Sequence, residues 1–192
     1  MNKLNNGIKK RQKPNDVIFT PKPVAELMIK MCNIKPDDKV LDPSKGGGIF
    51  FDNLPECDKS YCEINEDIDF FETTGKYDLI IGNPPYSLWS KWLDKTTELT
   101  DKFCYIFGVM NLTTPRLKSI YEKGYVIKKF HIIQVEYWFS LSFIVLFEKG
   151  EPNEGVIDFS SKRFNCDICN TRCGRGRKGN SYNKCYAKKE EA

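Results

Sequence analysis

Asn83-Pro84-Pro85-Tyr86 is the stretch of the chain best suited to chemistry. It follows the apolar run Tyr77–Gly82, which predicts a buried strand. Neither proline supplies a backbone N–H, so the chain must leave the sheet here, at a carboxyl end where open α/β sheets bind ligands. The turn offers an amide side chain, free carbonyls and an aromatic ring. Such a set can hydrogen-bond a planar amine and stack on the ring that carries it.

A glycine-rich turn forms a second candidate. The predicted strand Lys39–Asp42 runs into Pro43-Ser44-Lys45-Gly46-Gly47-Gly48. Glycines let the backbone approach a ligand closely, and an acid at such a turn suits a ligand with a cation and hydroxyls better than a pyrophosphate. S-adenosylmethionine carries a sulfonium and an ammonium. Taken alone, the segment is equally well explained as a glycine-rich surface turn.

Glu63 ends the next predicted strand, Ser60–Glu63. An acid about 20 residues after a glycine loop commonly hydrogen-bonds the ribose hydroxyls of a nucleoside cofactor. Strand-end acids are also common on solvated surfaces, so Glu63 carries weight only beside the other motifs.

Together these motifs resemble those of the adenine-N6 DNA methyltransferases, which use S-adenosylmethionine. The opening turn matches their Asn-Pro-Pro-Tyr signature, Asp42–Gly48 matches their cofactor loop, and Phe19–Pro21 resembles the segment that they place over the methionine moiety. The motif order resembles that of the gamma group, and the resemblance covers roughly residues 15–149. It implies that Asn83, Pro84, Pro85 and Tyr86 are catalytic. It implies a cofactor site formed by Phe19, Thr20, Pro21, Asp42, Pro43, Ser44, Gly46, Gly48, Glu63, Asp69, Phe70 and Asn83.

The segment around Asp69 departs from the family pattern. By the resemblance, Asp69 accepts a hydrogen bond from the cofactor's adenine amino group and Phe70 lies beside that ring. Only five residues separate Glu63 from Asp69, where the family fits a whole helix. Either the crossover helix is lost and that edge of the sheet is trimmed, or Asp69 is a surface acid. Lys45 occupies a position that is usually small, so its side chain is expected to point outward.

The resemblance also implies how the target is held. An adenine inside duplex DNA must be flipped into the site, where Asn83 Oδ1 and the Pro84 carbonyl accept from its amino group. Tyr86 is expected to stack on one face of the base. Phe139 is the expected residue on the other face, with Trp138 as the alternative, although core packing explains both aromatics as well.

Periodicity predicts an α/β fold, and the resemblance makes it the class I (Rossmann-like) methyltransferase fold. The sheet is expected to be mostly parallel with an antiparallel edge, because the last two strands read as a hairpin. The expected elements beyond those above are helices at Pro21–Asn33, Trp89–Thr96 and Arg116–Lys123, and strands at Asp78–Gly82, Lys102–Met110, Phe130–Phe139 and Leu141–Phe147.

Charge and apolar patterning divide the chain into four parts. We expect a basic flexible arm at 1–14, a catalytic domain at 15–150, a linker at 151–165 and a cysteine-rich basic tail at 166–192. The net charge of +4 combines an acidic body, −7 over residues 14–161, with two basic ends. This asymmetry favours a polyanion partner, although solvated tails would look the same. No apolar run is long enough to cross a membrane, so a cytosolic protein is expected.

Four cysteines in the tail form a candidate metal site. The spacing of Cys166, Cys169, Cys173 and Cys185 is typical of tetrahedral zinc in a reducing compartment. A metal would order a segment too glycine-rich to fold alone, giving a small zinc knob. The alternative is a basic tail with reduced thiols.

The sequence therefore predicts a compact adenine-N6 methyltransferase of DNA, of the kind used in restriction–modification, in phages or in mobile elements. Its small tail leaves room for a protein partner that supplies sequence specificity. The alternatives are methylation of another planar amine, namely release-factor glutamine or ribosomal RNA guanine-N2, or an inactive nucleic-acid-binding relative.

Overall fold

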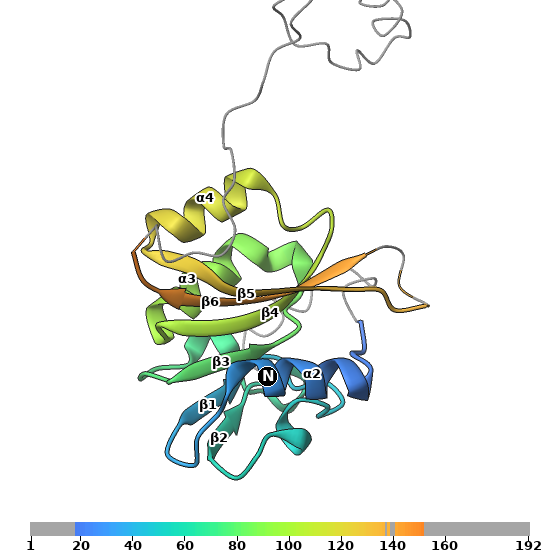
Figure 1. Cartoon of the computed structure of the whole chain (residues 1–192). Helices are drawn as coiled ribbons and strands as arrows, with labels where there is room; N and C mark the ends of the chain where they lie inside the picture. The colour runs from blue at the N-terminus through green and yellow to red at the C-terminus, as the bar shows by residue number, and fades with distance from the viewer. Residues whose placement is uncertain (1–17, 137, 139–140, 152–192) are drawn as a thin grey trace, which may run out of the picture. The chain divides into compact units, whose positions relative to one another are not determined.

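The computed structural model describes residues 18–136, 138 and 141–151 of the 192-residue chain (Figure 1). Within them, six strands form one sheet in the order β2-β1-β3-β4-β6-β5. The strands are β1 (Lys39–Asp42), β2 (Asp58–Tyr61), β3 (Leu79–Gly82), β4 (Lys102–Gly108), β5 (Tyr125–Ile133) and β6 (Ser142–Lys149).

The sheet is parallel over β2-β1-β3-β4 and antiparallel where β6 pairs with β4 and β5. The predicted mostly parallel sheet with an antiparallel edge is therefore confirmed. The carboxyl ends of β1, β2 and β3 lie at one edge, because these strands are parallel neighbours. The loops that leave them carry the motifs identified in the sequence.

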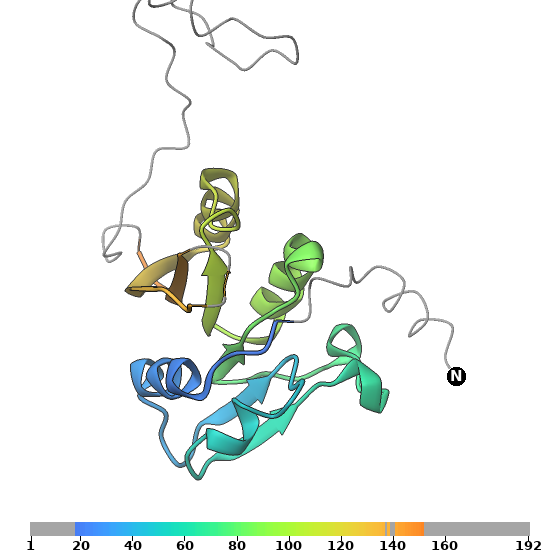
Figure 2. The same ribbon diagram turned by 90° about the vertical axis from the view of Figure 1, so that its right-hand side faces the viewer.

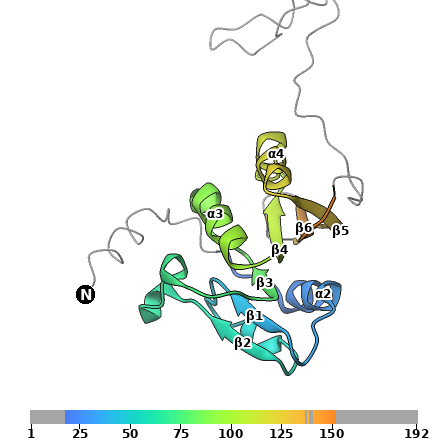
Figure 3. The same cartoon turned by 90° about the vertical axis from the view of Figure 1, so that its left-hand side faces the viewer.

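Helices cover both faces of this sheet, as Figures 2 and 3 show. The first, α2 (Lys22–Cys32), lies on one face, and α3 (Trp89–Leu99) and α4 (Thr114–Glu122) lie on the other. Pro21 caps the start of α2, with Pro23 in its first turn, and Asn33 ends it in the left-handed conformation. Lys102 Nζ and Lys129 Nζ donate to the carbonyls of Cys32 and Met31 at 3.0 and 2.7 Å, which satisfies the last turn of α2.

Two apolar clusters follow from these layers. The α2 side buries Ala25 and Met28 against Val40, Ile81 and neighbouring aliphatic residues. The opposite side is aromatic: Trp89, Trp92, Phe103, Tyr105, Phe107 and Phe147 are all buried there. The sheet is thus held from one side by a single helix and from the other by two helices and a ring cluster.

The predicted elements are all present, and all but the first strand have shifted ends. The second strand, β2, ends at Tyr61 rather than Glu63, and β5 begins at Tyr125 rather than Phe130. The early start of β5 has a local cause, since Gly124 turns the chain with φ of 82° and the buried Tyr125 hydroxyl donates to the Thr100 carbonyl at 2.6 Å. The strand also ends at Ile133, well before the predicted Phe139.

The edge of the sheet beyond β2 is trimmed. Between β2 and β3 the chain forms only two short 3₁₀ turns, η3 (Ile64–Glu66) and η4 (Phe70–Glu72), so the family's crossover helix is absent and β2 is an edge strand. Of the two alternatives for this segment, the structure has the shortened crossover.

Several predictions concern residues that the structure does not describe. These are the basic arm, Phe139, and the tail with Cys166, Cys169, Cys173 and Cys185. In the described part of the chain, no helix combines the length and apolarity that a membrane span requires.

Candidate functional site

The glycine turn after β1 is shaped by its backbone. Gly46 and Gly48 have φ of 52° and 83°, and a Cβ on Gly48 would lie 2.6 Å from Asp52 Oδ2. A Cβ on Gly47 would come within 3.7 Å of the Phe19 ring. The turn therefore favours glycine at 46 and 48 for its conformation, and at 48 also for the close approach of Asp52, whereas the contact at 47 is an ordinary one.

Asp42 lies beneath this turn and is fully buried. Its Oδ1 accepts from the Ser44 backbone N–H at 3.2 Å, while Oδ2 is buried without a partner. The pKa of Asp42 is raised to about 7, mainly by burial; hydrogen bonds from the Ser44 and Phe51 backbone groups lower it, and the nearby Glu63 raises it. A buried carboxyl with an unsatisfied oxygen is a receptor for a donor or a cation.

Glu63 leaves β2 and joins the same turn. Its Oε2 accepts from the Gly46 N–H at 2.8 Å and its Oε1 from the Asn65 N–H at 2.9 Å. Both bonds come from backbone groups, and Glu63 is only 9% exposed. The carboxylate is therefore fixed between the glycine turn and η3, at the edge of the pocket described below.

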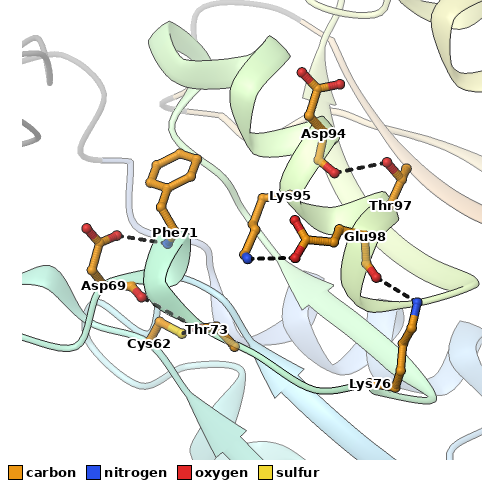
Figure 4. A network of polar contacts seen from close by, with 9 residues as sticks. All are labelled: Cys62, Asp69, Phe71, Thr73, Lys76, Asp94, Lys95, Thr97 and Glu98. Atoms are coloured by element: carbon orange, nitrogen blue, oxygen red, sulfur yellow. Dashed lines mark hydrogen bonds and ion pairs between the residues drawn. The ribbon is translucent and has the colours of Figure 1, made fainter.

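Asp69 is also buried, which is inconsistent with a surface acid. Its Oδ1 caps η4 by accepting from the Phe71 N–H at 2.9 Å, and the side chain is 6% exposed. Figure 4 shows this cap beside the contact between Cys62 and Thr73. Asp69 Oδ2 has no hydrogen-bond partner. One oxygen thus caps the turn, and the other is a buried acceptor without a hydrogen-bond partner.

These residues meet at a pocket of about 170 Å³ at the carboxyl ends of β1, β2 and β3. Most of the predicted cofactor-binding residues line it. The lining includes Phe19, Thr20, Pro43, Ser44, Gly46, Glu63, Asp69, Phe70, Asn83 and Pro85. Pro21, Asp42, Gly48, Pro84 and Tyr86 do not line it, although Asp42 and Gly48 shape the turn that does.

The pocket also contains residues that sequence analysis did not assign. They are Ile18, Lys45, Gly47, Ile49, Phe50, Ile64, Asn65, Ile68, Phe71 and Trp92. Ile64 directly follows the strand-end acid Glu63 and lines the same pocket. Trp92 comes from α3 and stacks near Phe70 with 4.4 Å between ring centroids, a contact that only the tertiary packing reveals.

Lys45 belongs to the glycine turn and lines the pocket, and its side chain extends to Glu66 and Tyr61. Its Nζ pairs with Glu66 Oε1 at 3.2 Å and lies 3.9 Å from the centroid of the Tyr61 ring. The Tyr61 hydroxyl in turn donates to Glu66 Oε2 at 2.8 Å. This outward direction agrees with the prediction for Lys45.

Asn83 stands where β3 ends, and its amide is held on both sides. Its Nδ2 donates to the Ile18 carbonyl and to Thr20 Oγ1, each at 3.3 Å. Its Oδ1 accepts from the Tyr86 hydroxyl at 3.2 Å, and that hydroxyl also lies 3.4 Å from the Ile106 carbonyl. Burial raises the pKa of Tyr86, so its hydroxyl stays a donor at neutral pH.

Trp138, the alternative stacking residue, is half-buried and packs with the α2-side cluster. Its indole Nε1 is buried without a partner. In this arrangement it does not line the pocket. Among the described residues, no group of three or more potential metal-ligating side chains is placed to hold a metal ion.

The chain is similar to known methyltransferases in both sequence and fold. It is 36% identical over 86 residues to type II methyltransferases M.HincII and M.HindII of Haemophilus influenzae, matches that cover 37% of this chain. They cover only 17% and 16% of those relatives, so the chain spans a small part of their length. No family model matches the chain.

Solved structures with the same fold include a Thermoplasma acidophilum protein (1320), the type I restriction enzyme EcoKI M protein and the 23S rRNA methyltransferase ErmE. Each has a TM-score of 0.53, at 16%, 12% and 13% identity. The matches cover 67%, 70% and 74% of this chain, and 84%, 44% and 72% of those chains.

These comparisons agree with the motifs, which meet at one pocket although they lie on separate loops. The resemblance read from the sequence is supported: part of the chain is similar in sequence to type II methyltransferases, and the chain has the fold of solved methyltransferases such as the EcoKI M protein and ErmE.

Proposed function

We propose that the protein transfers a methyl group from S-adenosylmethionine to the N6 amino group of adenine in DNA. The observation that carries this proposal is the position of Asn83. Its amide lines the same pocket as Glu63 and Asp69, so an amine bound at Asn83 would stand beside a bound nucleoside cofactor.

The pocket fits S-adenosylmethionine in the chemistry of its donors and acceptors. Glu63 is held by two backbone N–H groups and lines the pocket, which supports a role as acceptor for the ribose hydroxyls. Asp69 Oδ2 is a buried acceptor without a partner, which suits the adenine amino group beside Phe70. Asp42 and Phe19–Pro21 would hold the methionine end. When bound, the cofactor supplies an electrophilic methyl group on its sulfonium.

The residues of the chain would make the target amine reactive by orienting it. An exocyclic amine is a poor nucleophile because its lone pair is delocalised into the ring. Hydrogen bonds from its two N–H groups to Asn83 Oδ1 and the Pro84 carbonyl would favour a tetrahedral nitrogen and localise that lone pair. Catalysis by this route is positioning and electrostatics. Asn83 is no base, so the proton leaves to solvent after transfer.

Adenine in DNA is favoured over the other amines by two features. The basic ends of the chain surround an acidic body, a pattern that suits a nucleic acid better than a release factor. The sequence matches are to type II methyltransferases. The base would be flipped, with Tyr86 on one face and Phe139 or Trp138 on the other. Specificity would come from the tail, with zinc bound at its four cysteines, or from a protein partner in the cytosol.

The decisive experiment incubates the protein with duplex DNA and methyl-labelled cofactor and then analyses the nucleosides. The expected product is N6-methyladenine, and Asn83→Ala should abolish it while cofactor affinity stays within a few-fold. The choice of substrate would be overturned if DNA stayed unlabelled while the label appeared on guanine N2 in RNA or on glutamine in a release factor. Absence of cofactor binding would overturn the enzymatic proposal.

A further inference from the structure

The amide of Asn83 can be oriented without ambiguity from its neighbours. A backbone carbonyl only accepts hydrogen bonds, so the Asn83 atom that lies 3.3 Å from the Ile18 carbonyl must be Nδ2. The Tyr86 hydroxyl, 3.2 Å from the other amide atom, then meets Oδ1. The oxygen is thereby turned away from the Ile18–Thr20 segment.

Thr20 supplies the second acceptor for Nδ2, also at 3.3 Å. Its side chain is buried, with 8% exposure, so water competes poorly for this bond. Thr20 also lines the pocket together with Ile18, Phe19 and Asn83. The short segment before α2 therefore lines the proposed cofactor pocket and also hydrogen-bonds the Asn83 amide, the proposed acceptor of the substrate amine.

From this geometry we infer that Thr20 is a positioning residue that locks the Asn83 amide with Oδ1 as the acceptor for the substrate amine. This inference rests on the proposed function for its kinetic consequence. The amide has two faces that differ only in donor and acceptor, so an unheld Asn83 would present Nδ2 to the amine for part of the time. A donor there repels the substrate N–H and cannot localise its lone pair.

The Tyr86 hydroxyl holds the other end of the Asn83 amide. In this structure it donates to Asn83 Oδ1 at 3.2 Å and is also within 3.4 Å of the Ile106 carbonyl. The hydroxyl thus uses one of the two lone pairs of Oδ1, and it keeps that oxygen hydrogen-bonded before the substrate arrives. When the amine binds, the hydroxyl retains Ile106 as its alternative partner.

The test replaces the acceptor and keeps the shape. Thr20→Val removes Oγ1 without a change of volume, Thr20→Ser restores it, and Thr97→Val is the matched control. The Thr97 hydroxyl donates to the Asp94 carbonyl within α3, away from the pocket lining (Figure 4). Thr20→Val should lower kcat at saturating cofactor by roughly 10- to 100-fold, a larger factor than any loss of cofactor affinity, and Thr20→Ser should recover most of the rate. Wild-type kcat in Thr20→Val, or a loss that follows cofactor affinity alone, would overturn the inference.

A second measurement separates this inference from the choice of substrate. The Asn83 side-chain amide protons, assigned by NMR through their loss in Asn83→Asp, should exchange slowly in wild type and in Thr20→Ser. They should exchange at least tenfold faster in Thr20→Val. If DNA is not methylated but this pattern holds, the DNA assignment fails and the positioning role stands. Equal protection in wild type and Thr20→Val refutes the positioning role whatever the substrate is.

Discussion

At the scale of single residues, two acids each carry a buried oxygen without a protein partner. They are Oδ2 of Asp69, a residue that lines the pocket, and Oδ2 of Asp42, the last residue of β1. An unsatisfied buried acceptor costs free energy that a ligand donor can recover. Sequence analysis named both residues from the family resemblance. The sequence could not show which carboxylate oxygen of each acid is hydrogen-bonded. That depends on the folded positions of the Ser44 and Phe71 N–H groups, which donate to the Oδ1 atoms.

Asp69→Asn should weaken S-adenosylmethionine binding by roughly 10- to 100-fold, the usual range for removal of a charge-assisted hydrogen bond. The amide can still cap η4 through its oxygen, but it presents a donor or a neutral acceptor to the cofactor. Isothermal titration calorimetry measures the affinity. Glu72→Gln, an exposed change in the same turn, is the control. Equal affinities for the two variants would mean that Asp69 only caps the turn.

Asp42 predicts a pH dependence of stability. Its pKa in the folded protein is about 7, against an ordinary value of 3.8, so between these pH values the native state holds a proton that the unfolded chain has released. The free energy of unfolding should therefore fall as pH rises through this window, by at most about 1.4 kcal/mol per pH unit. Urea unfolding at pH 5, 6, 7 and 8 measures it.

The control for that experiment is Asp42→Asn, which keeps the Oδ1 acceptor and cannot ionise. The difference in unfolding free energy between wild type and this variant should change with pH and level off above about pH 7. A difference that is constant across the window would show that Asp42 is ionised in the folded protein throughout.

At the scale of elements, the glycine turn is the most constrained part of the site. Gly48 and Gly75 both have positive φ, 83° and 93°, but a Cβ on Gly48 would meet Asp52 at 2.6 Å, whereas nothing lies within 4 Å of a Cβ on Gly75. Alanine at either position has a strained backbone, but only alanine at 48 also meets a neighbouring side chain, so comparing the two variants isolates the steric effect.

Gly48→Ala should therefore destabilise the protein by about 1–3 kcal/mol more than Gly75→Ala. It should also weaken cofactor binding, since Asp52 must move and the turn moves with it. Urea denaturation and calorimetry give the two readouts. Equal effects of the two variants would show that the Asp52 side chain yields freely.

Elements were predictable where local sequence decides them. The first strand, Lys39–Asp42, was predicted with its exact bounds, because an apolar pair is followed directly by an acid and glycines. The hairpin was misplaced at its start, because Tyr125–Ile127 precede a Lys pair that hides the alternation. Trp92 and Ile68 were not assigned to the site, since their contribution depends on how α3 and the shortened crossover pack around the pocket.

At the scale of the whole molecule, charge separates the ends from the body. The tail segment Gly174–Gly179 holds Arg175, Arg177 and Lys178 between two of the four cysteines. The zinc site and its DNA contacts remain predictions, because those residues lie beyond the described part of the chain.

Replacing Arg175, Arg177 and Lys178 by alanine should weaken DNA binding, and more so at low salt. The slope of log affinity against log salt should fall by about 0.9 for each phosphate that the tail no longer neutralises, while cofactor affinity stays unchanged. Fluorescence anisotropy at several salt concentrations measures it. Lys30, Lys35 and Lys91, which are exposed on the catalytic unit, give a control triple with the same charge change. If both triple variants lowered DNA affinity equally, DNA binding would depend on the net charge of the protein and not on the tail.

The same tail offers a metal test. Cys166→Ser with Cys169→Ser, or zinc chelation, should weaken DNA binding and leave cofactor affinity intact, because the pocket is built from residues 18–92. Unchanged DNA affinity would show that the cysteines of the tail have no role in target recognition.

The shortened crossover places Glu63 and Asp69 on one uninterrupted stretch of chain. Glu63 and Ile68 close that stretch with an antiparallel bridge, and each carboxylate is anchored by an N–H two residues further along. The proposed nucleoside-binding acids are thus organised mainly by a contiguous peptide rather than by an outer strand and helix.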